Sequence, residues 1–389
     1  MTASMYGFTM RGVLCSWLCA VVLVGGFAVS GRAADEGACW PRFRGPEGTG
    51  MIPAADWKPE ALKGDVKIPW RRQVGVGYSS VSIADGRAYT MGNRDNKDTI
   101  FCLDAKTGEP VWKHSYNCPK GSHGGPRATP TVDGGAVYTI SSRGHVFCLD
   151  AAEGDVRWKR NVVKELKARP PKWGIAGSAL IWKGRVYLNA GKHGMALDKE
   201  TGKTVWSSPP GIGGYATPVP YAKDGKDFLV IFGEKAAFGV DADSGAEVWS
   251  YPWQTAHNVN AADPVVFDGR VFISSGYNRG GALLDISGDK VKKIWENRRL
   301  ATQFSSVIFK DGYLYGISGN VGRGQLRCLK AETGDQAWSV DLDFGQLILV
   351  GGKLVVLNEN GRLYVAEATP EAYKEIASGQ IGKGKQWWV

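Results

Sequence analysis

The 389-residue sequence lacks the short motifs by which common enzyme classes are recognised. It contains no serine-nucleophile motif, no glycine-rich phosphate loop between a strand and a helix, and no pair of carboxylates on a shared element. Histidine is scarce, with five residues, and no acidic cluster stands apart from the repeated turns described below. The sequence therefore assigns no catalytic residue and no metal ligand, and we expect no cofactor.

Long runs of like charge are also missing. The 48 Lys and Arg residues against 38 Asp and Glu give a net charge of +10, yet no run of five or more like charges exists. Basic residues scattered over a solvated surface account for this balance. The alternative is an acidic partner such as nucleic acid, a membrane surface or peptidoglycan. Without a basic segment, we expect no nucleic-acid partner.

Only one long apolar stretch exists, at residues 13–29. It follows Arg11 and precedes the small-residue site Gly31-Arg32-Ala33, which is the order of a secretory signal peptide. We predict a signal of the signal peptidase I type over residues 1–33, export to the periplasm or the extracellular space, and no integral membrane segment after cleavage. An uncleaved anchor is the alternative, although the stretch is short for a membrane span.

Cysteines are few and widely spaced. The predicted mature chain keeps an odd number of them, namely Cys39, Cys102, Cys118, Cys148 and Cys328. This is not the pattern of a disulfide framework, even in an exported protein. Cys102, Cys148 and Cys328 occupy matching positions in three copies of a repeat, which favours small buried strand residues over metal ligands.

That repeat is the main feature of the chain. The segment FCLDAKTGEPVWK begins at Phe101, recurs closely as FCLDAAEGDVRWK from Phe147, and recurs with more changes from Met195, Phe238, Leu283 and Leu326. Each copy predicts a strand, a tight turn built on glycine, and a second strand that carries a tryptophan; in every copy except that from Leu326, an aspartate starts the turn.

The repeated tryptophans set the period. They are Trp112, Trp158, Trp206, Trp249, Trp295 and Trp338, with spacings of 46, 48, 43, 46 and 43 residues. A period in the forties with four strand-like runs per unit is typical of β-propeller blades. We expect these tryptophans to be structural and to lie between adjacent blades.

The same layout predicts the number of blades. Innermost strands are expected near Ser79, Ala128, Gly177, Ala216, Ala262, Ser305 and Gln346, which makes seven. We predict an all-β propeller of four-stranded antiparallel blades over residues 66–389, on an eight-blade plan with the last blade incomplete. Residues 66–74 would be an unpaired outermost strand; the alternative is seven blades closed by these residues. Residues 34–65 are predicted to form an N-terminal extended arm.

The candidate site is one mouth of the central channel, where the segments that lead to the innermost strands converge. Its candidate ligand-binding residues are Tyr78, His123, Arg127, Trp173, Tyr215, His257, Asn258, Asn260 and Gln303. Arg127 would anchor the charge of an anionic or sugar-like ligand, and the aromatic residues would provide stacking faces. The same aromatics could instead plug the channel. A metal site at His123 and His257 would need a third ligand that the sequence does not place.

The LDAxTGxxxW repeat resembles the pyrroloquinoline-quinone (PQQ) propeller repeat of quinoprotein alcohol dehydrogenases and of the outer-membrane assembly lipoprotein BamB. The segment WPRFRGP at residues 40–46, with GYSSV, GPRATPTVDG and EATPEAYKE, is similar to exported PQQ-like propellers common in planctomycetes. The resemblance covers about residues 40–389. Quinoprotein dehydrogenases carry a vicinal disulfide, a calcium or lanthanide ion and an aspartate base. No residue here matches these, so the resemblance implies the scaffold alone.

We therefore expect a non-catalytic exported propeller that acts as a binding or scaffold module in the cell envelope. Its partner would be an envelope protein or a small ligand at the channel mouth, and the chain would be a monomer. The alternative is a PQQ-dependent periplasmic oxidoreductase similar to the quinoprotein dehydrogenases.

Overall fold

The computed structural model describes residues 39–53, 57–63, 66–121, 124–166 and 169–382. The predicted signal peptide and His123 lie outside these residues. Among the described residues, no helix is long and apolar enough to cross a membrane. All five described cysteines carry free thiols, and Cys102, Cys148 and Cys328 are buried in strands, as predicted.

Six sheets are four-stranded, and in each of them strands that follow along the chain pair antiparallel. The first two consist of β2 (Ser82–Ala84), β3 (Arg87–Arg94), β4 (Lys97–Asp104) and β5 (Pro110–Asn117), then β6 (Thr131–Asp133), β7 (Ala136–Ile140), β8 (His145–Asp150) and β9 (Val156–Asn161). The next two consist of β10 (Leu180–Trp182), β11 (Arg185–Leu188), β12 (Met195–Asp198) and β13 (Thr204–Ser207), then β14 (Val219–Lys223), β15 (Lys226–Phe232), β16 (Ala236–Asp241) and β17 (Glu247–Pro252). The last two consist of β18 (Val265–Phe267), β19 (Arg270–Ser275), β20 (Gly280–Asp285) and β21 (Lys292–Asn297), then β22 (Ile308–Lys310), β23 (Tyr313–Asn320), β24 (Arg323–Lys330) and β25 (Gln336–Asp341).

The seventh sheet is mixed and has five strands. β26 (Gly345–Val350), β27 (Lys353–Asn358), β28 (Arg362–Glu367) and β29 (Glu375–Gln380) form the antiparallel part, and β1 (Met51–Ile52) from the N-terminal region pairs parallel to β26. A short 3-10 helix, η1 (Pro59–Lys63), contacts β29, and α1 (Val162–Glu165) follows β9.

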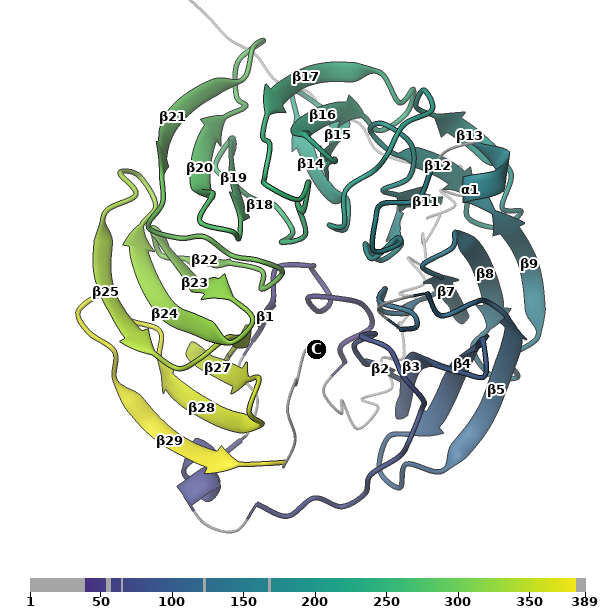
Figure 1. Cartoon of the computed structure of the whole chain (residues 1–389), viewed down its shortest axis with the longest axis horizontal. Helices are drawn as coiled ribbons and strands as arrows, with labels where there is room; N and C mark the ends of the chain where they lie inside the picture. Colours follow the sequence, from purple (N-terminus) through teal and green to yellow (C-terminus); the bar gives the residue numbers. More distant parts are fainter. Residues whose placement is uncertain (1–38, 54–56, 64–65, 122–123, 167–168, 383–389) are drawn as a thin grey trace, which may run out of the picture. The chain divides into compact units, whose positions relative to one another are not determined.

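The seven sheets follow one another around a central channel, with the innermost strand of each sheet toward the centre (Figure 1). Each predicted innermost strand is present and starts one to three residues from the expected position. The all-β propeller is therefore confirmed, with seven sheets among the described residues. This count agrees with the predicted alternative of seven blades, and the eight-blade plan is not confirmed. Residues 66–74 belong to none of the sheets, and the outermost strand of the seventh sheet is β29, so these residues do not close the seventh blade as that alternative expected.

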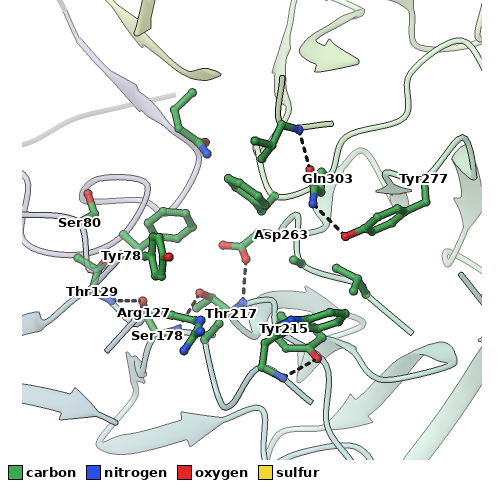
Figure 2. A pocket seen from close by; sticks show the side chains of 18 residues that line it. Tyr78, Ser80, Arg127, Thr129, Ser178, Tyr215, Thr217, Asp263, Tyr277 and Gln303 are labelled. Carbon is green, nitrogen blue, oxygen red and sulfur yellow. Dashed lines mark hydrogen bonds between the residues drawn. The ribbon is translucent and has the colours of Figure 1, made fainter. Parts of the chain in front are cut away.

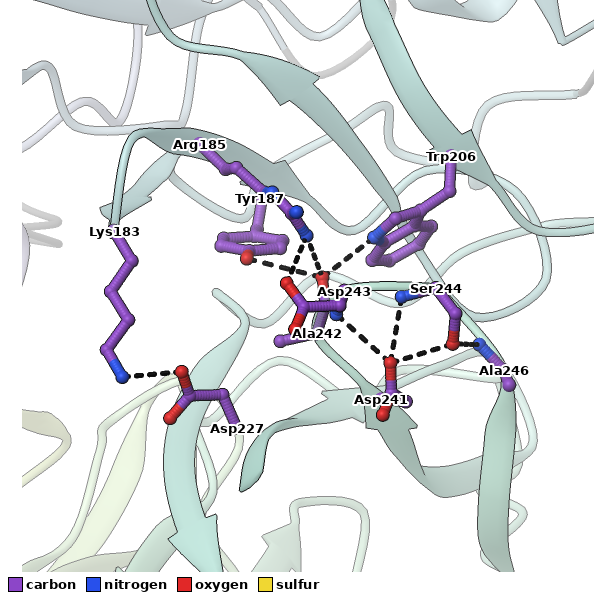
Figure 3. A network of polar contacts seen from close by, with 10 residues as sticks. All are labelled: Lys183, Arg185, Tyr187, Trp206, Asp227, Asp241, Ala242, Asp243, Ser244 and Ala246. Carbon is purple, nitrogen blue, oxygen red and sulfur yellow. Dashed lines mark hydrogen bonds and ion pairs between the residues drawn. The ribbon is translucent and has the colours of Figure 1, made fainter. Parts of the chain in front are cut away.

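The repeated hairpin fastens each sheet to the one before it. In Figure 3, Asp241 accepts backbone hydrogen bonds from Asp243 and Ser244 at 3.1 and 2.8 Å, which fixes the turn between β16 and β17. The carbonyl of Ala242 in this turn then accepts from the indole N–H of Trp206, 2.9 Å away in the preceding sheet. The tight turn presents a backbone acceptor that the large apolar side chain reaches while staying buried.

Most of the other repeat tryptophans make the same contact. Their indole N–H groups donate at 2.8–2.9 Å to the carbonyls of Ala151, Lys199, Ala331 and Thr369. At the glycine of the next turn, such as Gly154 or Gly202, an added Cβ would come within 3 Å of the tryptophan ring. Glycine is needed there because φ is positive and because the ring lies against the backbone.

Trp249 departs from this pattern. Its indole N–H donates to the hydroxyl of Tyr221 at 2.9 Å, and the ring lies over Gly239 in its own sheet. The next turn, which starts at Asp285, has its glycine three residues later instead of four, so it does not offer the usual seat for the ring.

Trp70 is a further fastener that the sequence pattern did not reveal. Its indole N–H donates to the Ala105 carbonyl at 3.1 Å, and its ring lies against Gly108 of the first sheet. Two residues later, Arg72 donates to the Gly108 carbonyl at 2.9 Å, much as Arg299 donates to the Gly334 carbonyl at 3.0 Å. Residues 66–74 thus hold the place of an outermost strand next to the first sheet, without strand partners among the described residues.

Replacing a fastening tryptophan should cost more stability than replacing Trp249. Trp158 is 8% exposed and holds the next sheet, so we expect Trp158→Ala to lower the free energy of unfolding by about 3–5 kcal/mol. Trp249→Ala, at a half-buried position without the contact to the next sheet, should cost clearly less. Urea unfolding of both variants checks this, and equal losses would contradict the fastening role.

Trp70→Ala should release residues 66–74 without unfolding the sheets. The Trp70 indole is the largest side chain of this segment that is seated on the first sheet, so we expect trypsin to cleave at Arg71 or Arg72 at least about tenfold faster in the variant. Circular dichroism should stay unchanged. Cleavage at the wild-type rate would show that the indole does not secure the segment.

Candidate functional site

A cavity of about 400 Å³ opens at one mouth of the channel (Figure 2). Most of its lining comes from two positions that repeat in the first six blades. The residues two positions before the first six innermost strands form the polar set, Ser80, Thr129, Ser178, Thr217, Asp263 and Ser306. The residues four positions before these strands form the variable set, Tyr78, Arg127, Ala176, Tyr215, Ala261 and Phe304.

The polar set links neighbouring blades around the channel. The backbone N–H of Thr129 donates to the Ser178 hydroxyl at 2.9 Å, and the N–H of Ser178 donates to the Thr217 hydroxyl at 3.1 Å. The series continues as the Thr217 N–H donates to the Asp263 carboxylate at 2.7 Å and the Asp263 N–H to the Ser306 hydroxyl at 3.3 Å. These bonds satisfy backbone groups where the chain enters the innermost strands, so the walls of the cavity are rigid.

The variable set shapes the cavity. Four of its six members are large, but Ala176 and Ala261 are small and leave space on their side of the channel. Trp173 and Tyr277 border that space, and the ring of His257 lies between them, with centroids 6.5 Å from Trp173 and 4.9 Å from Tyr277. The aromatic side chains therefore line the cavity and do not fill it.

Five of the predicted residues line the cavity together: Tyr78, Arg127, Trp173, Tyr215 and Gln303. The guanidinium of Arg127 lies 5.5 Å from the centroid of the Tyr78 ring and donates to the Gly125 carbonyl at 3.1 Å. Burial lowers the pKa of Arg127 and raises that of Tyr215. Gln303 donates to the Tyr277 hydroxyl at 3.0 Å, which fixes both side chains at the rim.

The other predicted residues lie elsewhere. Asn260 is fully buried, and its amide donates to the carbonyls of Gly233, Glu234 and Trp253, so it holds a loop. Asn258 donates to Glu234 at 2.8 Å. His257 is exposed and touches the cavity only through the aromatic neighbours that it contacts. His123 is outside the described residues.

Asp263 is the residue that sequence reasoning missed. It takes the position that serine or threonine takes in the other five members of the polar set, and this difference between aligned repeats was the available signal. It is 7% exposed and lines the cavity. Burial raises the pKa of Asp263 to about 6, an increase that the nearby guanidinium of Arg44 and hydrogen bonds from Thr217 oppose.

The N-terminal region supplies Arg44 and closes one side of the site. Trp40 pairs with Ile83 beside the first sheet, and β1 pairs with β26 of the seventh, so this segment crosses the channel. Arg44 is buried and donates to the carbonyls of Thr49 and Val307 at 2.9 and 2.6 Å, while Phe43 lines the cavity. The Arg44 guanidinium is a buried cation, and the nearby carboxylate of Asp263 compensates its charge.

This arrangement is suited to binding. The lining offers apolar and aromatic surface with one guanidinium and one buried carboxylate, the usual balance of a ligand pocket. Within the described ranges, no three His, Cys, Asp or Glu side chains come together as metal ligands would. The single carboxylate is held by Thr217, and no two cysteines are adjacent in the sequence, so these residues do not fit a metal–quinone site of the kind found in quinoprotein dehydrogenases.

The fold and its tryptophan hairpins define a β-propeller repeat protein with PQQ-like units. A sequence model of the family described as outer membrane protein assembly factor BamB matches residues 96–340. Because the match covers more than half of the chain, the protein belongs to this family.

Individual relatives agree with this assignment. The outer membrane protein assembly factor BamB of Burkholderia pseudomallei (strain K96243) is 26% identical over 363 residues, which cover 80% of this chain and 90% of that protein. The crystal structure of BamB from Moraxella catarrhalis, 18% identical, covers 79% of this chain and 88% of its own, with a TM-score of 0.59. The quinohemoprotein alcohol dehydrogenase from Comamonas testosteroni, 16% identical, covers 89% and 73%, with a TM-score of 0.65. At such identities the structural likeness shows the fold alone.

Asp263→Asn should remove a pH dependence of stability. Because the pKa is raised from 3.8 to about 6, the native chain keeps a proton that the unfolded chain releases between these values. The carboxyl group's contribution to stability is therefore largest at low pH and is lost as the pH rises through 6. The stability of the wild type relative to Asp263→Asn should fall by roughly 1–3 kcal/mol between about pH 4 and 7. Urea unfolding across this range checks it, and a difference that rises with pH would contradict the assignment.

Proposed function

We propose that this protein is a non-catalytic binding or scaffold module of the cell envelope, which holds a segment of a partner protein at the channel mouth. The observation that carries the proposal is the cavity itself. Small residues at Ala176 and Ala261 keep it open, and Trp173, Tyr215 and Tyr277 give it an apolar rim. Aromatic pockets of this kind anchor the central side chains of protein interfaces.

Family membership also supports a role as a binding or scaffold module of the envelope. The family is described as an outer membrane protein assembly factor, and we infer that the present chain likewise works in the envelope, on a partner protein. We further propose that residues 1–33 direct export to the periplasm or the extracellular space, that the chain acts as a monomer, and that it works without PQQ. We also propose that the protein belongs to the group of exported PQQ-like propellers that is common in planctomycetes.

We also propose the eight-blade plan. Trp70 and Arg72 donate hydrogen bonds to the first sheet, as residues of an outermost strand do to the next blade. No other strand of an eighth blade lies among the described residues. In such a plan, residues 66–74 are the fourth strand of an eighth blade.

Filling the cavity should abolish partner binding. Ala261→Phe places a large side chain where the variable set leaves space, whereas Ala152→Phe makes the same change on an exposed hairpin turn. We expect the wild type and Ala152→Phe to retain the same envelope protein in affinity purification, and Ala261→Phe to retain at least about tenfold less, with unchanged melting temperature. Equal retention by all three proteins would refute a role for the mouth.

PQQ titration tests the catalytic alternative directly. Purified protein is mixed with PQQ and calcium while dye-linked alcohol oxidation is followed. We expect neither saturable binding nor turnover. Saturable binding accompanied by turnover would replace the scaffold proposal with an oxidoreductase.

A further inference from the structure

A second cavity of about 220 Å³, here called the basic groove, adjoins the mouth on the side of Arg127 and Trp173, which line both cavities. Its described lining carries four basic side chains, Lys120, Arg127, Arg143 and Lys172, and no carboxylate. The lining of the basic groove is therefore positively charged, whereas apolar and aromatic surface predominates at the mouth.

The four cations come from three separate connections. Lys120 and Arg127 lie between β5 and β6, Arg143 lies in the β7–β8 hairpin, and Lys172 lies between β9 and β10. Like charges that line one cavity repel unless solvent or an anion screens them, so gathering them from three connections has a free-energy cost that a bound anion would offset.

The walls of the groove are fixed by the backbone. The N–H of Ile175 donates to the Ser142 carbonyl at 3.0 Å, and the N–H of Gly174 donates to the Pro171 carbonyl at 2.7 Å. A Cβ on Gly174 would come within 2.7 Å of Ser142, so the loop lies directly on the β7–β8 hairpin. These contacts fix the wall that residues 170–174 form against the β7–β8 hairpin.

Nearby carboxylates do not neutralise it. Asp98 is buried and accepts from the Asn93 amide at 2.6 Å. It acts electrostatically on Arg127 but does not line the groove. Glu165 pairs with Arg160 on the outer strand. Neither carboxylate lines the groove, and its four cations outnumber the one carboxylate that acts on Arg127, so the net potential of the groove stays positive.

We propose that the basic groove is an anion subsite, which binds the acidic residues of a peptide segment whose apolar side chain occupies the mouth. The inference rests on the proposed function and names the chemistry of the partner segment: an aromatic or aliphatic residue next to Asp or Glu. The two cavities meet at Arg127 and Trp173, so neighbouring residues of one peptide reach both. The net charge of +10 also attracts an acidic segment from a distance.

A displayed library of random octapeptides tests the proposal. It is selected against the wild type, against a groove variant (Lys120→Gln, Arg143→Gln, Lys172→Gln) and against a control variant that removes three exposed lysines of outermost strands or their turns (Lys113→Gln, Lys159→Gln, Lys203→Gln). All variants keep Arg127 and the residues of the mouth. We expect the wild type and the control to enrich peptides with Asp or Glu beside an apolar residue, and the groove variant to enrich apolar residues alone.

Affinity measurements with one selected acidic peptide and its Asn or Gln counterpart complete the test. The acidic peptide should lose roughly tenfold in affinity with the groove variant, since each exposed ion pair contributes less than a factor of ten, and should weaken as salt is raised. The neutral counterpart should bind all three proteins alike.

The outcomes separate the two proposals. Enrichment of apolar peptides without an acidic preference in the wild type would overturn the anion subsite and leave the mouth as a binding site. An acidic preference that persists in the groove variant would also overturn the assignment to this groove. No enrichment by the wild type, with Ala261→Phe behaving the same, would overturn the proposed function and this inference with it.

Discussion

The hydrogen bond from a tryptophan indole to a turn carbonyl of the next sheet is the interaction on which the rest of the structure depends. It places a large apolar ring between sheets and satisfies its one polar atom, as in Trp206 and Ala242. In most copies the turn carries aspartate, which fixes its backbone, and glycine, which lets the ring approach; the turn that receives Trp295 has Lys330 in place of the aspartate. These demands explain why aspartate, glycine and tryptophan recur at regular spacing in most copies of the repeat.

Because the hairpins fix the spacing of the sheets, the segments that lead to the innermost strands are free to vary. In the first six blades they supply one polar and one variable residue near the channel mouth. Four of the polar residues donate a hydrogen bond to the next blade's polar residue, and the variable residues line the cavity. Small residues at two positions open the cavity, and Asp263 places a carboxylate where other blades have a hydroxyl. The residues that shape the cavity are therefore the ones that differ between the repeats.

The propeller, its sheets and most of the fasteners were predictable from the sequence because they arise from local patterns repeated many times. Trp70 was not, since VKIPWRRQV lacks the preceding aspartate and glycine; its seat on Gly108 depends on contact across the chain. The site residues were likewise predictable only where a local pattern placed them. Arg127 and Trp173 were found by their place before an innermost strand, whereas Asn260, in an equally suggestive segment, turns inward to bind three carbonyls. Phe43 and Arg44 reach the site from a distant segment, which no local pattern indicates.

The central claim is that the mouth of the channel holds a partner protein. A photo-crosslinking amino acid placed at Ala176, inside the cavity, and at Ala152, on an exposed turn, tests it most directly in intact cells. The account predicts one discrete protein adduct from position 176 and none of the same mass from position 152. Adducts of the same kind from both positions, or none from position 176 in cells that fold and export the protein normally, would contradict it.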